Sequence, residues 1–157
     1  MKRVVTILFL RRESEVLLAM KKRGFGEGKW NGVGGKVEGG ETVTAGAIRE
    51  CQEEIGVTPK NPKLVGRLTF YDEADPEFCH DTHIFIATEW EGEPHETEEM
   101  RPQWFKETDI PYDNMWVDDH LWMPLLLQDK LFQGRNVVFN QKNLVHHDIT
   151  EVKELEE

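Results

Sequence analysis

Two hydrophobic runs lie close together at the start of the chain, with a short polar break between them. The first run, Arg3–Leu10, is rich in β-branched and large apolar residues, and the second covers Glu15–Met20. Glu13 and Ser14 lie between the two runs. Apolar runs joined by a short polar segment are typical of a β-hairpin, so the sequence predicts one here.

A glycine-rich stretch and a helical pattern follow this hairpin. Eight glycines fall within residues 24–40, which predicts loops with one short strand around Val33–Val37. The segment Glu41–Ile55 then places apolar or small side chains at helical spacing, and Gly56 follows as a stop signal. We therefore expect an α-helix over residues 41–55.

The rest of the chain combines strand-like runs with one more helix. Extended runs are expected at Leu64–Tyr71, His83–Trp90, Arg101–Phe105, Asn136–Phe139 and Asn143–Ile149. The segment Asp118–Leu131 has its leucines at helical spacing, and Gly134 lies just beyond it. This order of elements predicts an α/β fold in which helices pack on the faces of a mixed sheet.

The length and charge of the chain narrow its possible partners. A chain of 157 residues suits one domain spanning 1–157, of which the acidic tail, about 150–157, is expected to fray. The formal charge is −11, from 19 Lys and Arg against 30 Asp and Glu. Such a charge argues against binding of nucleic acid. It leaves room for an acidic site loaded with Mg²⁺, because the ion inverts the local charge.

The cysteines and the N-terminus favour a reducing compartment. Cys51 and Cys79 form neither a disulfide framework nor a zinc-binding pattern. The N-terminal apolar run lacks the features of a signal peptide, and no apolar run approaches the roughly 20 residues of a membrane helix. We expect a cytoplasmic protein that acts as a monomer and does not bind membranes.

Three glutamates lie together on the first predicted helix. Glu50, Glu53 and Glu54 stand at positions i, i+3 and i+4, so their carboxylates share one face and repel one another. A solvated acidic face is one interpretation of this cluster. The other is a site for Mg²⁺ or Mn²⁺, whose preferred ligands are carboxylate, water and phosphate oxygens.

The surrounding spacing decides between these two interpretations, because it resembles the Nudix box of the Nudix hydrolase family. That box has Gly, five residues, Glu, seven residues, Arg-Glu, an apolar residue, any residue, Glu-Glu, any residue, Gly and an apolar residue. The matching positions are Gly35, Glu41, Arg49, Glu50, Cys51, Glu53, Glu54, Gly56 and Val57. The one mild departure is Cys51, in a slot that is more often aliphatic. The resemblance implies a Nudix α/β/α sandwich.

The box residues have separable roles. Gly35 lets the backbone approach a metal–phosphate site, and its carbonyl could be a metal ligand. Glu41, near the helix start, could pair with Arg49 two turns later, which makes both residues structural.

The glutamates of the box are expected to hold the metal and to carry the chemistry. Glu50, Glu53 and Glu54 would bind divalent ions that bridge phosphate oxygens, orient a water molecule and neutralise the leaving pyrophosphate. One group must take the proton of that water. Glu53 is the first candidate, and Glu99, in a separate acidic stretch, is the second and a further possible metal ligand. A plain surface charge is the alternative for Glu99.

Three further segments, Met20–Lys36, Glu99–Phe105 and Met115–Gln128, resemble the MutT-type oxidised purine nucleoside triphosphatases, specifically their vertebrate form. The resemblance extends from Thr6 to about Phe132. It implies Mg²⁺-dependent hydrolysis of substrates such as 8-oxo-dGTP, with 2-hydroxy-dATP as a further candidate, to the monophosphate and pyrophosphate, which cleanses the nucleotide pool.

An aromatic residue and two carboxylates near the second helix fit a purine site. Trp116 offers a ring for base stacking. Asp118 and Asp119 can accept hydrogen bonds from the donor edge of a purine, and two adjacent carboxyls push their pKa values apart, so that one can stay protonated and donate. The alternative for Asp118 is a helix N-cap, with Asp119 in the first turn.

The resemblance implies further residues around the nucleotide: Thr6, Lys21, Phe25, Asn31, Phe70 and Trp122. Without the resemblance, Phe70 and Trp122 would be assigned to the core and Lys21 to the surface. The segment Asp72–Asp81 departs from the family pattern, and His80 stands where an apolar pocket residue is expected.

Two other functions stay open from the sequence. One is a Nudix enzyme acting on O6-methyl-dGTP, ADP-ribose or a dinucleoside polyphosphate. The other is a Nudix domain that binds nucleotides without catalysis, although such domains usually lose the box glutamates that this chain keeps.

Overall fold

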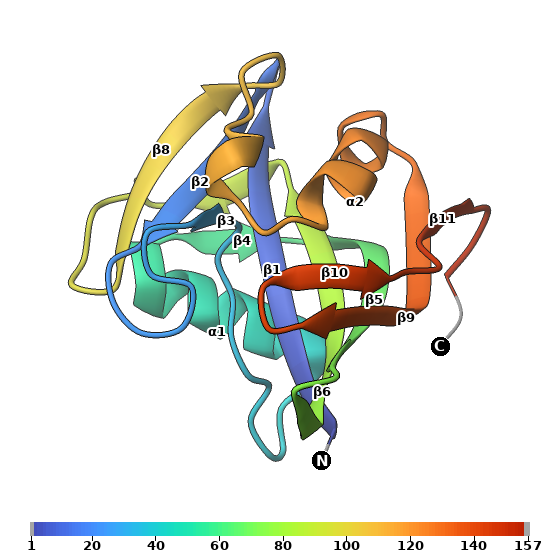
Figure 1. Ribbon diagram of the computed structural model, residues 1–157. Coiled ribbons are helices and arrows are strands. Elements are labelled where there is room, and N and C mark those ends of the chain that lie inside the picture. The colour runs from blue at the N-terminus through green and yellow to red at the C-terminus, as the bar shows by residue number, and fades with distance from the viewer. Residues whose placement is uncertain (1, 156–157) are drawn as a thin grey trace.

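A large mixed sheet forms the frame of the molecule (Figure 1). The computed structural model describes residues 2–155. The strands are β1 (Lys2–Arg12), β2 (Glu15–Lys21), β3 (Trp30–Asn31), β4 (Thr58–Lys60), β5 (Lys63–Asp72), β6 (Asp75–Ala87), β7 (Glu89–Glu91), β8 (Met100–Lys106), β9 (Leu131–Asn140), β10 (Asn143–His146) and β11 (Thr150–Val152). The helices are α1 (Val43–Ile55), α2 (Asp119–Leu127) and the short 3-10 helix η1 (Tyr112–Asn114). Within these described residues, nine strands join one sheet, and β4 and β7 form a second.

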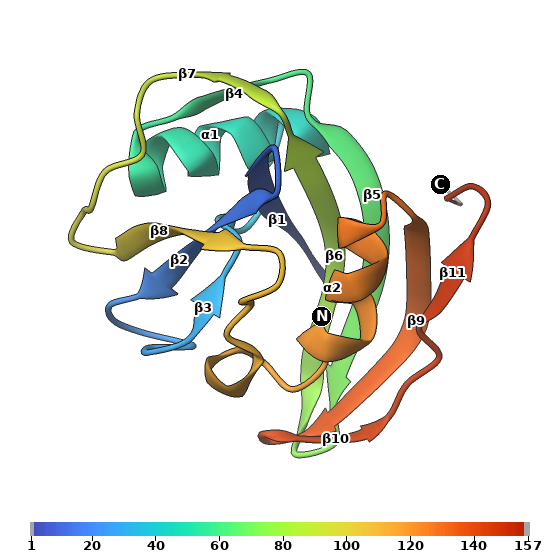
Figure 2. The same cartoon turned by 90° about the horizontal axis from the view of Figure 1, so that it is seen from above.

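Strand β1 changes partners along its length. Its residues 2–10 run parallel to β6, and it pairs with β2 only at its far end, through Arg11 and Arg12. β2 then turns away from β1 and pairs with β3 and β8 instead (Figure 2). Val33 and Lys36, from the glycine-rich stretch, each bridge back to β1 at one point. The two parts of the sheet are therefore splayed apart along most of β1.

Helix α1 covers one face of the sheet, and both its ends have local signals. The Thr42 hydroxyl accepts a hydrogen bond from the Ala45 N–H at 3.0 Å, which caps the helix start. Gly56 ends the helix with a φ of 74°, a conformation that favours glycine. The inner face of the helix, with Cys51 and Ile55 fully buried, packs in a core cluster with the alternate side chains of β1 and β2.

Helix α2 covers the opposite face, so the sheet lies between the two helices in both views (Figures 1 and 2). Its buried side chains Trp122, Met123 and Leu126 pack in a second cluster that includes Phe9 of β1 and Phe132 of β9. The predicted α/β fold with a mixed sheet between helices is confirmed. Neither helix within residues 2–155 has the length and apolarity needed to span a bilayer.

Several element boundaries differ from the sequence prediction. The strand expected at Val33–Val37 lies at Trp30–Asn31 instead, because only these residues pair with β2. The second helix ends at Leu127 rather than at Leu131. Leu131 is instead the first residue of β9, a strand that pairs with β5 from Phe132 onward. Gly134 is therefore inside a strand and is not a helix stop.

The segment around residue 75 and the acidic tail also differ. The run expected at His83–Trp90 is the end of a longer strand, β6, which begins at Asp75 and makes a hairpin with β5. The expected fraying of the tail is wrong for Thr150–Val152, which pair with β9. Lys130 lies 3.4 Å from Glu151 and offsets part of the acidic charge there. Residues 156 and 157 of the tail lie outside the described residues.

The contact between β5 and β9 predicts a strong effect at Gly66. A Cβ atom on Gly66 would overlap the buried ring of Phe132. We expect Gly66→Ala to lower the free energy of unfolding by about 1–3 kcal/mol, measured by urea denaturation. Gly39→Ala is the control, because a Cβ atom there meets nothing within 4 Å. Equal stability of the two variants would contradict the tight packing described here.

Candidate active site

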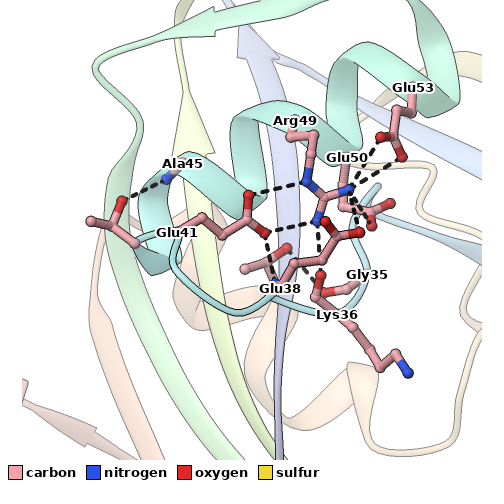
Figure 3. A network of polar contacts seen from close by, with 10 residues as sticks. Gly35, Lys36, Glu38, Glu41, Ala45, Arg49, Glu50 and Glu53 are labelled. Carbon is pink, nitrogen blue, oxygen red and sulfur yellow. Dashed lines mark hydrogen bonds and ion pairs between the residues drawn. The ribbon is translucent and has the colours of Figure 1, made fainter.

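The guanidinium of Arg49 ties the loop before α1 to the acidic face of the helix (Figure 3). Its Nε and Nη2 atoms donate to the two carboxylate oxygens of Glu41 at 3.1 and 2.9 Å, and Nη2 also donates to the Lys36 carbonyl at 3.0 Å. Its Nη1 atom donates to Glu50 at 3.1 Å and to Glu53 at 3.2 Å. The predicted pair of Glu41 and Arg49 is confirmed, and hydrogen bonds from Arg49 lower the pKa of Glu41.

Glu54 differs from the other box glutamates because it is buried. The residue is 8% exposed, and its Oε2 atom is buried without a hydrogen-bond partner. Burial, together with the charge of Glu50, raises the pKa of Glu54 to about 8. Lys21 and the Gly34 N–H counteract this shift in part. The fold therefore holds a carboxyl group at this point in an environment that opposes its charge.

A cavity of about 680 Å³ opens on the α2 face of the sheet, near the glycine-rich loop. It is lined by all the residues predicted around the nucleotide: Thr6, Lys21, Phe25, Asn31, Phe70, Trp116, Asp118, Asp119 and Trp122. Gly35 of the box lines the same cavity. The structure thus brings these residues together, while their contact with a substrate stays a prediction.

The cavity also has walls that the sequence analysis missed. Thr82, Met100 and Phe139 contribute side chains from β6, β8 and β9. His80, placed at the pocket on the strength of the resemblance, lines it from β6. Alternation along β6 could have indicated Thr82, because it shares a face with His80 two residues earlier. Nothing in the local sequence identifies Met100 or Phe139, whose positions depend on strand register.

Two buried carboxyl groups line the cavity where α2 begins. Asp118 and Asp119 are 3% and 2% exposed. The Trp122 Nε1 atom donates to Asp118 Oδ2 at 2.8 Å, whereas Asp119 Oδ2 is buried with no hydrogen-bond partner. Burial raises the pKa of both groups, and the neighbouring charge of Asp118 raises the pKa of Asp119 further. Asp118 occupies the N-cap position of α2 and Asp119 lies in its first turn, as the alternative interpretation expects, but the Asp118 side chain makes no capping hydrogen bond.

Aromatic rings occupy two levels of this cavity. The Phe25 ring, 71% exposed, stacks on Trp116 with centroids 5.1 Å apart and planes at 23°. The Trp122 ring is instead 1% exposed and stacks on Phe132 at 5.4 Å. Trp122 is therefore both a core residue and part of the cavity wall, whereas Phe25 and Trp116 form an accessible aromatic surface.

A family model described as the NUDIX domain matches residues 1–126. The chain belongs to the Nudix family. It is 46% identical over 153 residues to an oxidized purine nucleoside triphosphate hydrolase of Danio rerio, covering 98% of this chain and 97% of the relative. The enzyme of the same name from Mus musculus is 45% identical over 150 residues, covering 96% of each chain. The predicted resemblance to this branch of the Nudix family is confirmed.

A solved structure supports the same assignment. The crystal structure of a mutator MutT protein from Bacillus halodurans superposes with a TM-score of 0.81 at 30% sequence identity. The superposition covers 94% of this chain and 97% of the other. The Nudix fold is therefore shared over nearly the whole length.

Nudix hydrolases generally need a divalent metal ion, and the residues of this Nudix box fit one. The charge of Glu50 raises the pKa of Glu54, so the two carboxyls lie near each other, and the unpartnered Glu54 Oε2 is an orphaned oxygen that a cation would satisfy. A Cβ atom on Gly35 would lie 2.6 Å from the Glu50 carboxylate, so only glycine lets the backbone approach it. The site thus brings together Gly35, Glu50 and Glu54.

The other two predicted metal ligands lie apart from this group. Within residues 2–155, no three His, Cys, Asp or Glu side chains are arranged as a ready-made metal site. The Glu53 side chain is 59% exposed, and Arg49 Nη1 connects it to Glu50 by donating to both carboxylates. The Glu99 carboxylate accepts hydrogen bonds from Arg23 Nε and Nη2 at 3.0 and 2.6 Å. Metal binding by Glu53 and by Glu99 stays a prediction.

The buried Glu54 carboxyl predicts an unusual dependence of stability on pH. Because its pKa is raised from 4.5 to about 8, its contribution to folding is complete below pH 4.5 and is lost as the pH rises toward 8. Glu54→Gln should therefore have a higher Tm than the wild type near pH 8 in EDTA, and the two should converge near pH 4. Added Mg²⁺ should raise the Tm of the wild type and leave Glu54→Gln nearly unchanged.

Glu98→Gln serves as the matched control, because the Glu98 side chain is 89% exposed. Its melting curves should follow the wild type at every pH, with and without Mg²⁺. A Glu54→Gln profile parallel to that of the wild type would refute the assignment of a raised pKa.

Proposed function

We propose that this protein hydrolyses oxidised purine nucleoside triphosphates to the monophosphate and pyrophosphate, with Mg²⁺ as its metal ion. The observation that carries the proposal is the pair Asp118 and Asp119, two buried carboxyls that line the same cavity as Gly35 of the Nudix box. The names of the fish and mouse relatives support the substrate class. Cleansing of the nucleotide pool in the cytoplasm, by a monomer, is the proposed biological role. The free thiols of Cys51 and Cys79 are compatible with that reducing compartment.

Base recognition rests on unequal protonation of the aspartates. Asp119, whose pKa is the more strongly raised, stays protonated and donates a hydrogen bond to the base. Asp118 accepts a hydrogen bond from the base. A donor and an acceptor side by side match the carbonyl and N–H of an oxidised guanine. Exchange of the proton between the two carboxyls reverses this pattern and would admit an oxidised adenine.

Three other side chains hold the base in the cavity. The Trp116 ring provides a stacking surface, and Phe25, its exposed neighbour, can cover the base from outside. The Asn31 Oδ1 atom accepts a hydrogen bond from the Gly32 N–H at 2.8 Å, which orients the amide. Its Nδ2 group then remains to donate to another edge of the base.

The phosphate end of the site is formed by the Nudix box. Glu50, Glu54 and the Gly35 carbonyl would hold the divalent ion, which supplies positive charge to the phosphate oxygens and the leaving pyrophosphate. Lys21 lines the cavity close enough to Glu54 to lower its pKa, so its ammonium adds positive charge here. Glu53, exposed to water beside Arg49, remains the proposed proton acceptor, with Glu99 as the alternative.

Product release with Mg²⁺ tests this function directly. Pyrophosphate and phosphate would be measured with 8-oxo-dGTP, 2-hydroxy-dATP, dGTP, dATP and ADP-ribose. We expect pyrophosphate from the two oxidised nucleotides and far slower turnover of the other three. Turnover of ADP-ribose alone would keep the Nudix chemistry and overturn the proposed substrate.

The aspartate pair predicts a specific loss of discrimination. Asp119→Asn replaces a carboxyl that can donate or accept with an amide that cannot exchange a proton. We expect kcat/KM for 8-oxo-dGTP to fall about 10–100-fold, the cost of disturbing one buried hydrogen bond to the base. Asp113→Asn, at an exposed aspartate of η1, should leave it unchanged. If both variants retain wild-type kcat/KM, Asp119 has no part in reading the base.

A further inference from the structure

One wall of the cavity is more polar than the rest. The hairpin between β5 and β6 lines it with Asp72, Asp75 and His80. Asp72 Oδ1 accepts hydrogen bonds from the backbone N–H groups of Ala74 and Gln141, at 2.9 and 3.0 Å. Asp75 Oδ1 likewise accepts one from the backbone at 3.1 Å. The carboxylates of Asp72 and Asp75 therefore stabilise the hairpin turn, and Asp72 also stabilises its contact with the β9–β10 hairpin.

The His80 side chain differs from these two carboxylates in its contacts. His80 sits on β6 opposite Phe70 of β5 and beside Arg3 of β1, and it is partly buried. Its ring stacks on Phe78, two residues earlier on the strand, with centroids 4.1 Å apart and planes at 26°. The stack fixes the ring plane and covers one face. Among the described residues, neither ring nitrogen of His80 has a hydrogen-bond partner.

The His80 ring is held in its neutral form. Burial, with the charges of Arg3 and Lys36, lowers its pKa below the ordinary value. A neutral imidazole carries one N–H donor and one nitrogen acceptor, and its tautomer can adapt to either need. Partly buried polar atoms that lack a protein partner gain most from a ligand that supplies one.

We propose that His80 is a specificity-determining residue of the cavity, and that its imidazole hydrogen-bonds to a polar atom of the bound purine that Asp118 and Asp119 do not contact. This inference rests on the proposed function. The base is then read from α2 by two carboxyls and from β6 by one imidazole, and both sides can switch between donating and accepting. His80 touches the base rather than the reacting phosphates, so its effect falls on binding.

Four proteins separate this hydrogen bond from simple packing: the wild type, His80→Met, His80→Gln and Phe78→Leu. Titration calorimetry with 8-oxo-dGMP measures base affinity without turnover. We expect His80→Met to raise Kd about tenfold, the loss of one hydrogen bond. His80→Gln, which keeps a donor and an acceptor, should recover much of the affinity, and Phe78→Leu should weaken binding less than His80→Met.

Kinetics and magnetic resonance complete the test. With 8-oxo-dGTP, His80→Met should raise KM about tenfold and change kcat little. The ¹⁵N signals of the His80 ring in the wild type should move when 8-oxo-dGMP is added, as a hydrogen bond to the ligand requires. An unchanged Kd in His80→Met, or ring signals that do not move, would overturn the role of His80.

The two proposals fail in distinguishable ways. If the wild type releases no pyrophosphate from oxidised nucleotides, the proposed function fails on that result alone. Should 8-oxo-dGMP also fail to bind the wild type, the role of His80 falls with it. Normal turnover of 8-oxo-dGTP with equal Kd values for the wild type and His80→Met would instead overturn the role of His80 and leave the function standing.

Discussion

The fold around the Nudix box depends on one positive charge, the guanidinium of Arg49. It donates two hydrogen bonds to Glu41 and one to the Lys36 carbonyl, so it fixes the loop that contains Gly35. It also contacts Glu50 and Glu53, whose charges would otherwise repel each other on one helix face. Arginine suits this position better than lysine, because its planar fork of donors can serve several carboxylates at once. The acidic face of α1 is therefore organised before any ligand arrives.

Three carboxyls that Arg49 does not contact are buried inside the fold. Glu54, Asp118 and Asp119 are buried, and two of them have an oxygen atom without a hydrogen-bond partner. Such groups destabilise a fold when they ionise. We propose that Glu54 helps to hold the metal ion and that Asp118 and Asp119 contact the base, so a bound ion or base would satisfy these carboxyls. The positions where burial opposes ionisation of a carboxyl are therefore the positions where we propose that ligands bind.

Local signals predicted the first hairpin and α1, because turn residues, caps and helical spacing are properties of neighbouring residues. The spacing of the box also predicted the ion pair between Glu41, just before α1, and Arg49, eight residues later on the helix. The short strands β4 and β7 gave no hydrophobic signal, because Thr58–Lys60 and Glu89–Glu91 are mostly polar and form only through their mutual pairing. Register also placed Phe139 in the cavity, which no local pattern could indicate. The spacing of the glutamates alone could not show that Arg49 bridges Glu50 and Glu53.

The partner change of β1 has a consequence for the order in which the protein takes shape during synthesis. β1 leaves the ribosome before its parallel partner β6, which lies at Asp75–Ala87, and the helix α2 that forms a wall of the cavity follows later still. Long-range parallel pairing forms slowly, because a large loop must close first. The first hairpin and α1 can therefore emerge early, but the base-binding cavity cannot exist until most of the chain has been translated. A nascent chain therefore contains the acidic helix α1 well before the cavity proposed to bind a purine has formed.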